Sequence, residues 1–301
     1  MYQLFDMRPP MRMALFLGLS GIGMILGALI SFSIVSAILH IPFSEMQKVI
    51  MQPEYASMAQ FANALASIIA FGLPSIALAI LVKGNWMANM GFAPLKSFQS
   101  AGIVILVALT GMILSGALGS LTEKIPIPTD FKNWAEGLEA QYKKAMLSMT
   151  HMSSLKDLFF ALLAVAIIPS IIEEVYFRGT LQKIVLDLTG KPYAAIILTA
   201  IFFSAIHFSF FGFLSRMALG IVLGYVYHYS KTIWLPILLH FLNNGIAVFI
   251  LYSIRNNPSN VEKMMDDHLP IYWGIIALVG IYYLLKQLKN NYNNAGLEKS
   301  I

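Results

Sequence analysis

The chain has no cysteine and few charged residues. Without cysteine it forms no disulfide framework, and no thiol is available as a nucleophile or metal ligand. Charged residues make up 12% of the 301 residues and hydrophobic residues 58%, whereas an average soluble chain carries about 25% charged residues. The net charge of +5 is modest and indicates no nucleic-acid partner. The composition argues against a soluble domain and predicts an integral membrane protein.

Apolar runs of about 20 residues, the length that crosses a bilayer, recur along the whole sequence. They predict an all-α fold, a polytopic helical bundle that forms one integral membrane domain over residues 1–301. The first run is much longer than the apolar part of a signal peptide, about 7–15 residues, so we expect it to be a retained helix. The eight expected transmembrane helices are 13–39, 60–82, 100–121, 158–177, 192–208, 213–229, 232–253 and 269–286.

Lysine and arginine are unevenly divided between the two sides of the expected bundle. If the N-terminus lies inside, more of these residues fall on the cytoplasmic side, as the positive-inside rule requires. The lysines of the 122–157 loop oppose this assignment, but acidic residues in the same loop accompany them. An even number of spans then places both termini in the cytoplasm.

The segment 122–157 is expected to be an extramembrane loop that contains an amphipathic helix. Its apolar side chains recur at spacings of three and four residues, which is the helical period. We expect this helix to lie on the lipid headgroups or to pack over the bundle, because amphipathicity alone indicates no chemistry. A lid over a site within the membrane is the alternative. The periodic residues are Phe131, Trp134, Ala135, Leu138, Tyr142, Ala145, Met146 and Met149.

Two adjacent glutamates and an arginine lie in the stretch "SIIEEVYFRGTL", residues 170–181, at the end of an apolar run. Burial of an ionisable side chain at membrane depth costs free energy, so such side chains usually form ion pairs or take part in the function of the protein. On a helix, Glu174 and Arg178 are four residues apart with the acid first, which favours an ion pair. Glu173 is rotated by about 100° and does not share that partner equally. The spacing predicts a structural Glu174–Arg178 pair and a free Glu173 carboxylate that suits a general base. A structural cluster of both glutamates around Arg178 is the alternative.

Two of the six histidines, His207 and His240, lie within apolar stretches, in "FFSAIHF" and "LPILLHFLNNG". Gly190 marks the turn between two expected spans, with Glu173 17 residues before it and His207 17 residues after it. In an antiparallel helical hairpin, equal distances from the turn place two side chains at the same depth. We therefore expect Glu173 and His207 to meet. Phe203, four residues before His207, is expected to shield the imidazole.

Asn244 follows His240 by four residues and lies on the same helix face, whereas Asn243 is expected to face elsewhere. Two chemistries fit these residues. In the first, Glu173, His207 and His240 hold a zinc ion and leave a fourth position for water. In the second, Glu173 and His207 polarise a water directly, and His240 and Asn244 stabilise the oxyanion. Both hydrolyse an amide bond. A transporter or channel that uses the same groups for ion or proton passage is the alternative without hydrolysis.

Three short motifs, "EEVYFR", "FSAIH" and "HFLNN", resemble those of the CAAX-protease and bacteriocin-processing family of intramembrane endopeptidases, which includes the type II CAAX prenyl endopeptidases. The family pattern is E-E-x-x-x-R, then F-x-x-x-H, then H-x-x-x-N. The similarity covers about 155–250, which would be the catalytic core. The residues that match are Glu173, Glu174, Arg178, Phe203, His207, His240 and Asn244.

The resemblance implies that Glu173, His207 and His240 are catalytic, that Asn244 assists them, and that the site opens to the membrane interior. We therefore expect an endopeptidase in the plasma membrane of a prokaryote, with a membrane-embedded or lipid-associated peptide or protein as substrate. Zinc and metal-free mechanisms both stay open, as does the oligomeric state. The alternative is a non-proteolytic membrane protein, either a transporter or a peptide-binding immunity factor. The sequence shows no internal repeat of the kind that many transporters contain.

Overall fold

The structure is a computed structural model that describes residues 7–149, 151–257 and 269–297. Within these ranges the regular elements are helices and no strand occurs, so the predicted all-α fold is confirmed. The α-helices are α1 (Pro9–Leu39), α2 (Met46–Val49), α3 (Ala56–Ser67), α4 (Leu73–Leu81), α5 (Trp86–Asn89), α6 (Gln99–Glu123), α7 (Thr129–Met149), α8 (Leu155–Ala161), α9 (Ile168–Glu174), α10 (Gln182–Thr189), α11 (Pro192–Ala205), α12 (Phe213–Ser230), α13 (Trp234–Ile254) and α15 (Ile271–Leu297).

Six helical stretches of the described chain are long and apolar enough to cross a membrane, so the expected count of eight is not confirmed. The difference lies in the expected spans 192–208 and 213–229. The helix α11 has only 14 residues, and α12, although 18 residues long, carries Arg216 and His228. The six stretches are Pro9–Leu39, Pro53–Leu81, Gln99–Thr122, Leu155–Thr189, Trp234–Ile254 and Ile271–Asn293.

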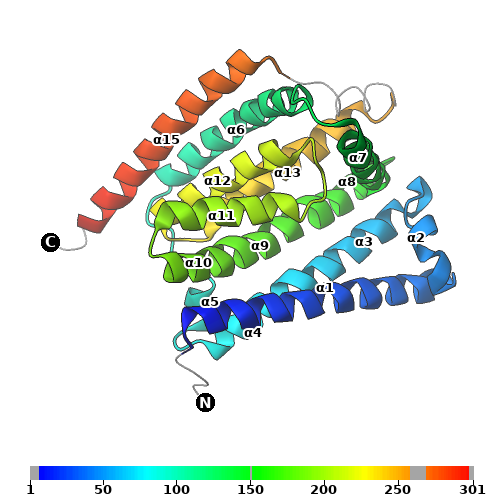
Figure 1. Cartoon of the computed structure of the whole chain (residues 1–301), viewed down its shortest axis with the longest axis horizontal. Helices are drawn as coiled ribbons and strands as arrows, with labels where there is room; N and C mark the ends of the chain where they lie inside the picture. The colour runs from blue at the N-terminus through cyan, green and yellow to red at the C-terminus, as the bar shows by residue number, and fades with distance from the viewer. Residues whose placement is uncertain (1–6, 150, 258–268, 298–301) are drawn as a thin grey trace.

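The long helices form one bundle, in which α13 packs against α6, α12 and α9 (Figure 1). The helices α6 and α15 lie side by side on one flank, and α1 packs against α3 and α4 on the other. The start of α1 and the end of α15 lie at the same end of the bundle, whereas α7 lies at the opposite end (Figure 1). The cytoplasmic location of the termini stays a prediction.

The stretch 155–189 is one long helix with two π-helical turns, Leu162–Ile167 and Val175–Leu181, on either side of α9. A π-helical turn adds a residue to the helical repeat and is frequent at functional sites. The stretch ends at Gly190, whose φ of 65° is left-handed and whose N–H donates to the Leu186 carbonyl at 2.8 Å. Glycine adopts this conformation without steric cost, so Gly190 turns the chain back into α11, as predicted.

Two glycines of α12 allow that helix to approach its neighbours closely. A methyl group at Gly220 would lie 3.0 Å from the Ala200 side chain of α11, and one at Gly224 would lie 2.8 Å from the Ile196 side chain. The carbonyl of Gly220 accepts a hydrogen bond from Arg178. Small residues thus bring α12 against both halves of the hairpin that carries the candidate site.

Candidate active site

Glu174 and Arg178 form a fully buried ion pair. Their side chains are 0% exposed, and Nη1 of Arg178 lies 2.7 Å from Oε1 of Glu174, so the predicted pair is confirmed. Nη2 of the guanidinium donates to the Gly220 carbonyl at 3.0 Å, and its Cζ atom lies 4.8 Å from the Phe203 ring centre. The pair therefore ties the start of the second π-helical turn to α11 and α12.

Glu174 has a second partner that the sequence did not indicate. Its Oε1 atom also lies 2.8 Å from Nδ1 of His240, which comes from α13 and is 3% exposed. Because the carboxylate oxygen is an acceptor, Nδ1 of His240 carries the proton of this hydrogen bond. Glu174 therefore orients His240 as well as neutralising Arg178.

His207 is held in a comparable way by the backbone. It follows the last turn of α11, and its Nδ1 donates to the Phe203 carbonyl at 2.7 Å. The Phe203 ring packs edge-on against His207, at 5.0 Å between ring centres, and against His240, at 5.8 Å. The predicted shielding of the His207 imidazole by Phe203 is confirmed.

Both histidines point their second ring nitrogen at Glu173. The Nε2 atoms of His207 and His240 each lie 4.0 Å from Oε2 of Glu173, so the predicted meeting of Glu173 and His207 is confirmed. The Glu173 side chain is 14% exposed, and its Oε2 atom is buried without a hydrogen-bond partner in the described chain. In the neutral histidines Nε2 is an acceptor, since Nδ1 carries the proton. Three acceptor atoms therefore face one another with space for a donor between them.

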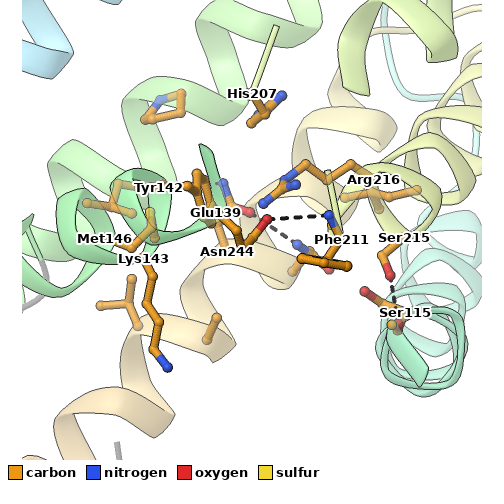
Figure 2. Close-up of a pocket in the computed structure, with 18 of the residues that line it drawn as sticks. Ser115, Glu139, Tyr142, Lys143, Met146, His207, Phe211, Ser215, Arg216 and Asn244 are labelled. Atoms are coloured by element: carbon orange, nitrogen blue, oxygen red, sulfur yellow. Dashed lines mark hydrogen bonds between the residues drawn. The ribbon is translucent and has the colours of Figure 1, made fainter. Parts of the chain in front are cut away.

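These atoms lie at a cavity of about 820 Å³, within the usual range of about 300–1,000 Å³ for ligand pockets. Its walls come from α6, α7, α9, α12 and α13, with contributions from α3 and the loop after α11. Figure 2 shows side chains of α7 on one side of the cavity and those of α12 on the other. The labelled lining residues are Ser115, Glu139, Tyr142, Lys143, Met146, His207, Phe211, Ser215, Arg216 and Asn244.

The amphipathic helix α7 packs over the bundle, which is one of the two positions expected for it, and its inner face forms a wall of the cavity. Oε2 of Glu139 accepts a hydrogen bond from the Ser209 hydroxyl at 2.7 Å. It also accepts one from the Phe211 N–H at 3.4 Å (Figure 2). Phe131 packs edge-on against Phe210, at 5.3 Å between ring centres. The helix is thus attached to the loop that carries His207, which agrees with the lid alternative.

Asn244 lies on the cavity wall, as does Asn243, so the expectation that Asn243 faces elsewhere is wrong. The cavity follows a broad face of α13 rather than a single line of residues. The Asn243 amide donates to Oδ1 of Asn244 at 3.1 Å, and the Asn244 amide donates to the Val165 carbonyl at 3.3 Å. These bonds orient Asn244 and leave its second N–H for another acceptor.

The residue types around Glu173 suit zinc, but their spacing does not. Adjacent ligands of tetrahedral zinc, bound at about 2.0–2.1 Å, lie roughly 3.3 Å apart, whereas Glu173 Oε2 is 4.0 Å from each Nε2. In the described part of the chain, no three His, Cys, Asp or Glu side chains are grouped to hold a metal ion. Two acceptors that bind the same water, each about 2.8 Å from the water oxygen, lie about 4.0–4.6 Å from each other when the angle at that oxygen suits two hydrogen bonds. The spacing fits a water.

We expect the purified protein to contain much less than one zinc per chain, and a chelator to leave its activity unchanged. The physical reason is that the three atoms would have to close by more than half an ångström to coordinate zinc. Elemental analysis of dialysed protein measures the metal content, with His207→Ala as the control. Stoichiometric zinc that is lost in His207→Ala would contradict this expectation.

Arg216, Tyr142 and Glu139 are cavity residues that sequence reasoning did not select. Arg216 lies inside the apolar run 213–229 and lines the cavity. An ionisable residue inside an apolar run is the same signal that identified Glu173. Tyr142 and Glu139 gave no such signal, because their place on the wall depends on how α7 packs.

Comparisons with known proteins show what this chain is similar to. Residues 155–246 match the family model described as Type II CAAX prenyl endopeptidase Rce1-like. The chain is also similar to the "Putative membrane peptidase YdiL" of Bacillus subtilis (strain 168), at 25% identity over 163 residues. That alignment covers 52% of this chain and 61% of the relative, so the chain spans about three fifths of the relative's length. No solved structure matches significantly. The chain is an integral membrane protein. The family that its three motifs resemble also has the matching family model, and that match covers the residues that carry all three motifs.

Proposed function

We propose that the protein is an intramembrane endopeptidase that hydrolyses a peptide bond of a membrane-associated protein or peptide with a water activated by Glu173 and His207. The observation that carries the proposal is the convergence of Glu173 Oε2 with the Nε2 atoms of His207 and His240, each at 4.0 Å, at a large cavity. The Nδ1 atoms of His207 and His240 donate to the Phe203 carbonyl and to Glu174, respectively. Both imidazoles are therefore oriented towards Glu173 before a substrate arrives.

The hydrogen-bonding capacity of the cluster suggests how the water is held. A water has two protons, whereas Glu173, neutral His207 and neutral His240 offer three acceptors, so one further proton is needed. We assign it to His240, because its Nδ1 faces the Glu174 carboxylate at 2.8 Å. The water then donates to Glu173 and His207, and Nε2–H of His240 is free to donate.

Each bond change then has a group that serves it. The water oxygen attacks the scissile carbonyl carbon while Glu173 accepts one proton of the water. The carbonyl π electrons move to the oxygen, and this oxyanion accepts hydrogen bonds from Nε2–H of His240 and the second N–H of Asn244. When the C–N bond breaks, the leaving nitrogen takes the proton from Glu173. Hydrolysis yields an amine and a carboxylic acid, and Glu173 is again ionised.

A comparison of peptide termini in membranes tests the proposal. Cells that express the wild-type protein should contain new peptide termini that cells expressing Glu173→Gln lack, since the amide cannot accept the proton. The comparison also identifies a substrate for assays with purified protein in liposomes. Identical sets of termini in the two membranes would contradict endopeptidase activity.

Replacement of Asn244 by alanine is expected to lower kcat by roughly 10²–10³ and to change KM little. An oxyanion donor acts only when negative charge develops in the transition state, and this is the range measured for loss of one such donor. Cleavage kinetics in liposomes measure the effect. Asn63→Ala, an asparagine of α3 that lines the same cavity, is the matched control and should keep the wild-type rate. A folded Asn244→Ala protein with unchanged kcat would show that the oxyanion role is wrong.

A further inference from the structure

Arg216 is a cation at the cavity wall. It lies in the first turn of α12, and its Nη1 atom is buried without a hydrogen-bond partner among the described residues. No carboxylate of the described chain lies within 4.0 Å of its guanidinium nitrogens. Buried polar groups are nearly always hydrogen-bonded, so an unsatisfied guanidinium nitrogen beside a cavity calls for an acceptor beyond the described residues, such as a bound ligand.

The surroundings of Arg216 hold the guanidinium in place without neutralising it. It stacks on the Tyr142 ring of α7, with 4.5 Å between the guanidinium carbon and the ring centre. On another side it lies so close to Gly212 that a methyl group at that position would overlap Nη1. Figure 2 shows the Arg216 side chain extending from α12 towards α7 across the cavity. A stacked guanidinium has lost part of its freedom already, which lowers the cost of binding a planar anion.

The nearby carboxylates of the cavity wall have other partners. Glu139 accepts from Ser209 and Phe211, and Glu136 lies 3.7 Å from Lys132. Neither is within ion-pair distance of Arg216. The cavity therefore presents a positive group on its α12 side and the Glu173–histidine cluster on another part of its wall.

We propose that Arg216 is a substrate-binding residue that holds a carboxylate of the peptide, either its C-terminal carboxylate or an Asp or Glu side chain. The inference rests on the proposed endopeptidase function, because a ligand that fills this cavity reaches both Arg216 and Glu173. Guanidinium and carboxylate groups match as a planar, two-bond pair, and such charge-assisted bonds are the strong ones. Arg216 would thus select which peptides enter and fix their position relative to the water.

Peptide binding tests this proposal without requiring cleavage. Short apolar peptides are prepared in three forms, with a free C-terminal carboxylate, with a C-terminal amide, or with the amide and one internal glutamate. They are bound to full-length protein in liposomes, in the Glu173→Gln background, and the retained peptides are measured by mass spectrometry. We expect at least one carboxylate form to bind about 10–100-fold more tightly than the neutral amide. The form that gains affinity identifies the source of the carboxylate.

The preference should depend on Arg216 alone. Arg216→Gln should abolish it, and Arg216→Lys should retain part of it, because lysine keeps the charge but not the planar pair of donors. Arg255→Gln is the matched control, since Arg255 also stacks on a tyrosine, Tyr252, but does not line the cavity. Gly212→Ala should weaken the preference by displacing the guanidinium, and it provides a second test if Arg216→Gln does not fold.

Equal binding of the acid and amide forms would overturn the proposal. It would also be overturned if Arg216→Gln kept the preference. A third contrary result is that Arg216→Gln changes only the rise in melting temperature caused by phosphatidylglycerol vesicles, because Arg216 would then bind a lipid phosphate. These outcomes differ from failure of the proposed function, which appears as equal peptide termini with wild type and Glu173→Gln.

Discussion

Replacement of Glu173 by glutamine should lower peptide cleavage by about 10²–10⁴-fold and leave the melting temperature unchanged or slightly higher. The rate falls because the amide cannot accept a proton from the water, and general-base catalysis contributes about this factor. Stability is kept because Oε2 of Glu173 has no hydrogen-bond partner in the described chain, so no native bond is lost. Removal of a buried carboxylate also removes its desolvation cost.

Cleavage of the identified peptide in liposomes and thermal melting in detergent measure the two effects separately. Glu136→Gln is the matched control, because Glu136 lines the same cavity but is largely exposed. It should keep the wild-type rate. A Glu173→Gln protein that melts well below the wild type would show that Glu173 is structural, and one that cleaves at the wild-type rate would show that it is not the base.

Replacement of the neighbouring Glu174 by glutamine should instead destabilise the protein by about 3–5 kcal/mol, the usual cost of removing one partner of a buried ion pair. Arg178 would be left fully buried without its anion, and His240 would face an uncharged amide in place of the carboxylate at its Nδ1. At roughly 2–4 °C per kcal/mol, the melting temperature should fall by about 10 °C. Activity should fall as well, since His240 lacks the carboxylate that favours its second proton.

The double variant Glu174→Gln/Arg178→Met separates the two contributions of Glu174. Removal of both charges should restore part of the lost stability, because no uncompensated charge stays buried. Activity should not return, because His240 still lacks the carboxylate that favours its second proton. If Glu174→Gln melts at the wild-type temperature, the ion pair does not have the structural role assigned to it here.

The hairpin that carries the site was predictable because it depends on local signals. Gly190 supplies the left-handed turn, and regular helical rise then places Glu173 and His207 at the same depth. The two π-helical turns beside α9 were not predictable, since an apolar run looks the same with either hydrogen-bond pattern. The expected count of eight spans was not confirmed, because apolar runs do not show where α11 ends and the run that forms α12 also contains polar residues.

The sequence predicted which side chains meet around Glu173, but it did not predict the contacts between distant helices that orient them. The pairing of Glu174 with Arg178 follows from spacing within one helix. The contact between Glu174 of α9 and His240 of α13 joins two residues that are 66 positions apart in the chain, and no local pattern reports it. The position of α7 over the cavity likewise depends on Glu139 meeting Ser209 and on Tyr142 meeting Arg216. Such contacts belong to tertiary packing.

The central claim is that a water held by Glu173 and His207 hydrolyses a peptide bond, with His240 as a donor to the oxyanion. The most direct test is mass spectrometry of the substrate peptide after incubation with purified protein in liposomes, in water labelled with heavy oxygen. The account predicts that wild-type protein yields a fragment with heavy oxygen in its new C-terminal carboxyl group, and that Glu173→Gln yields almost none. Equal labelled product from both proteins would contradict the role of Glu173. Intact peptide with both proteins, together with collapse of a solute gradient across the wild-type liposomes, would show a transporter instead of an endopeptidase.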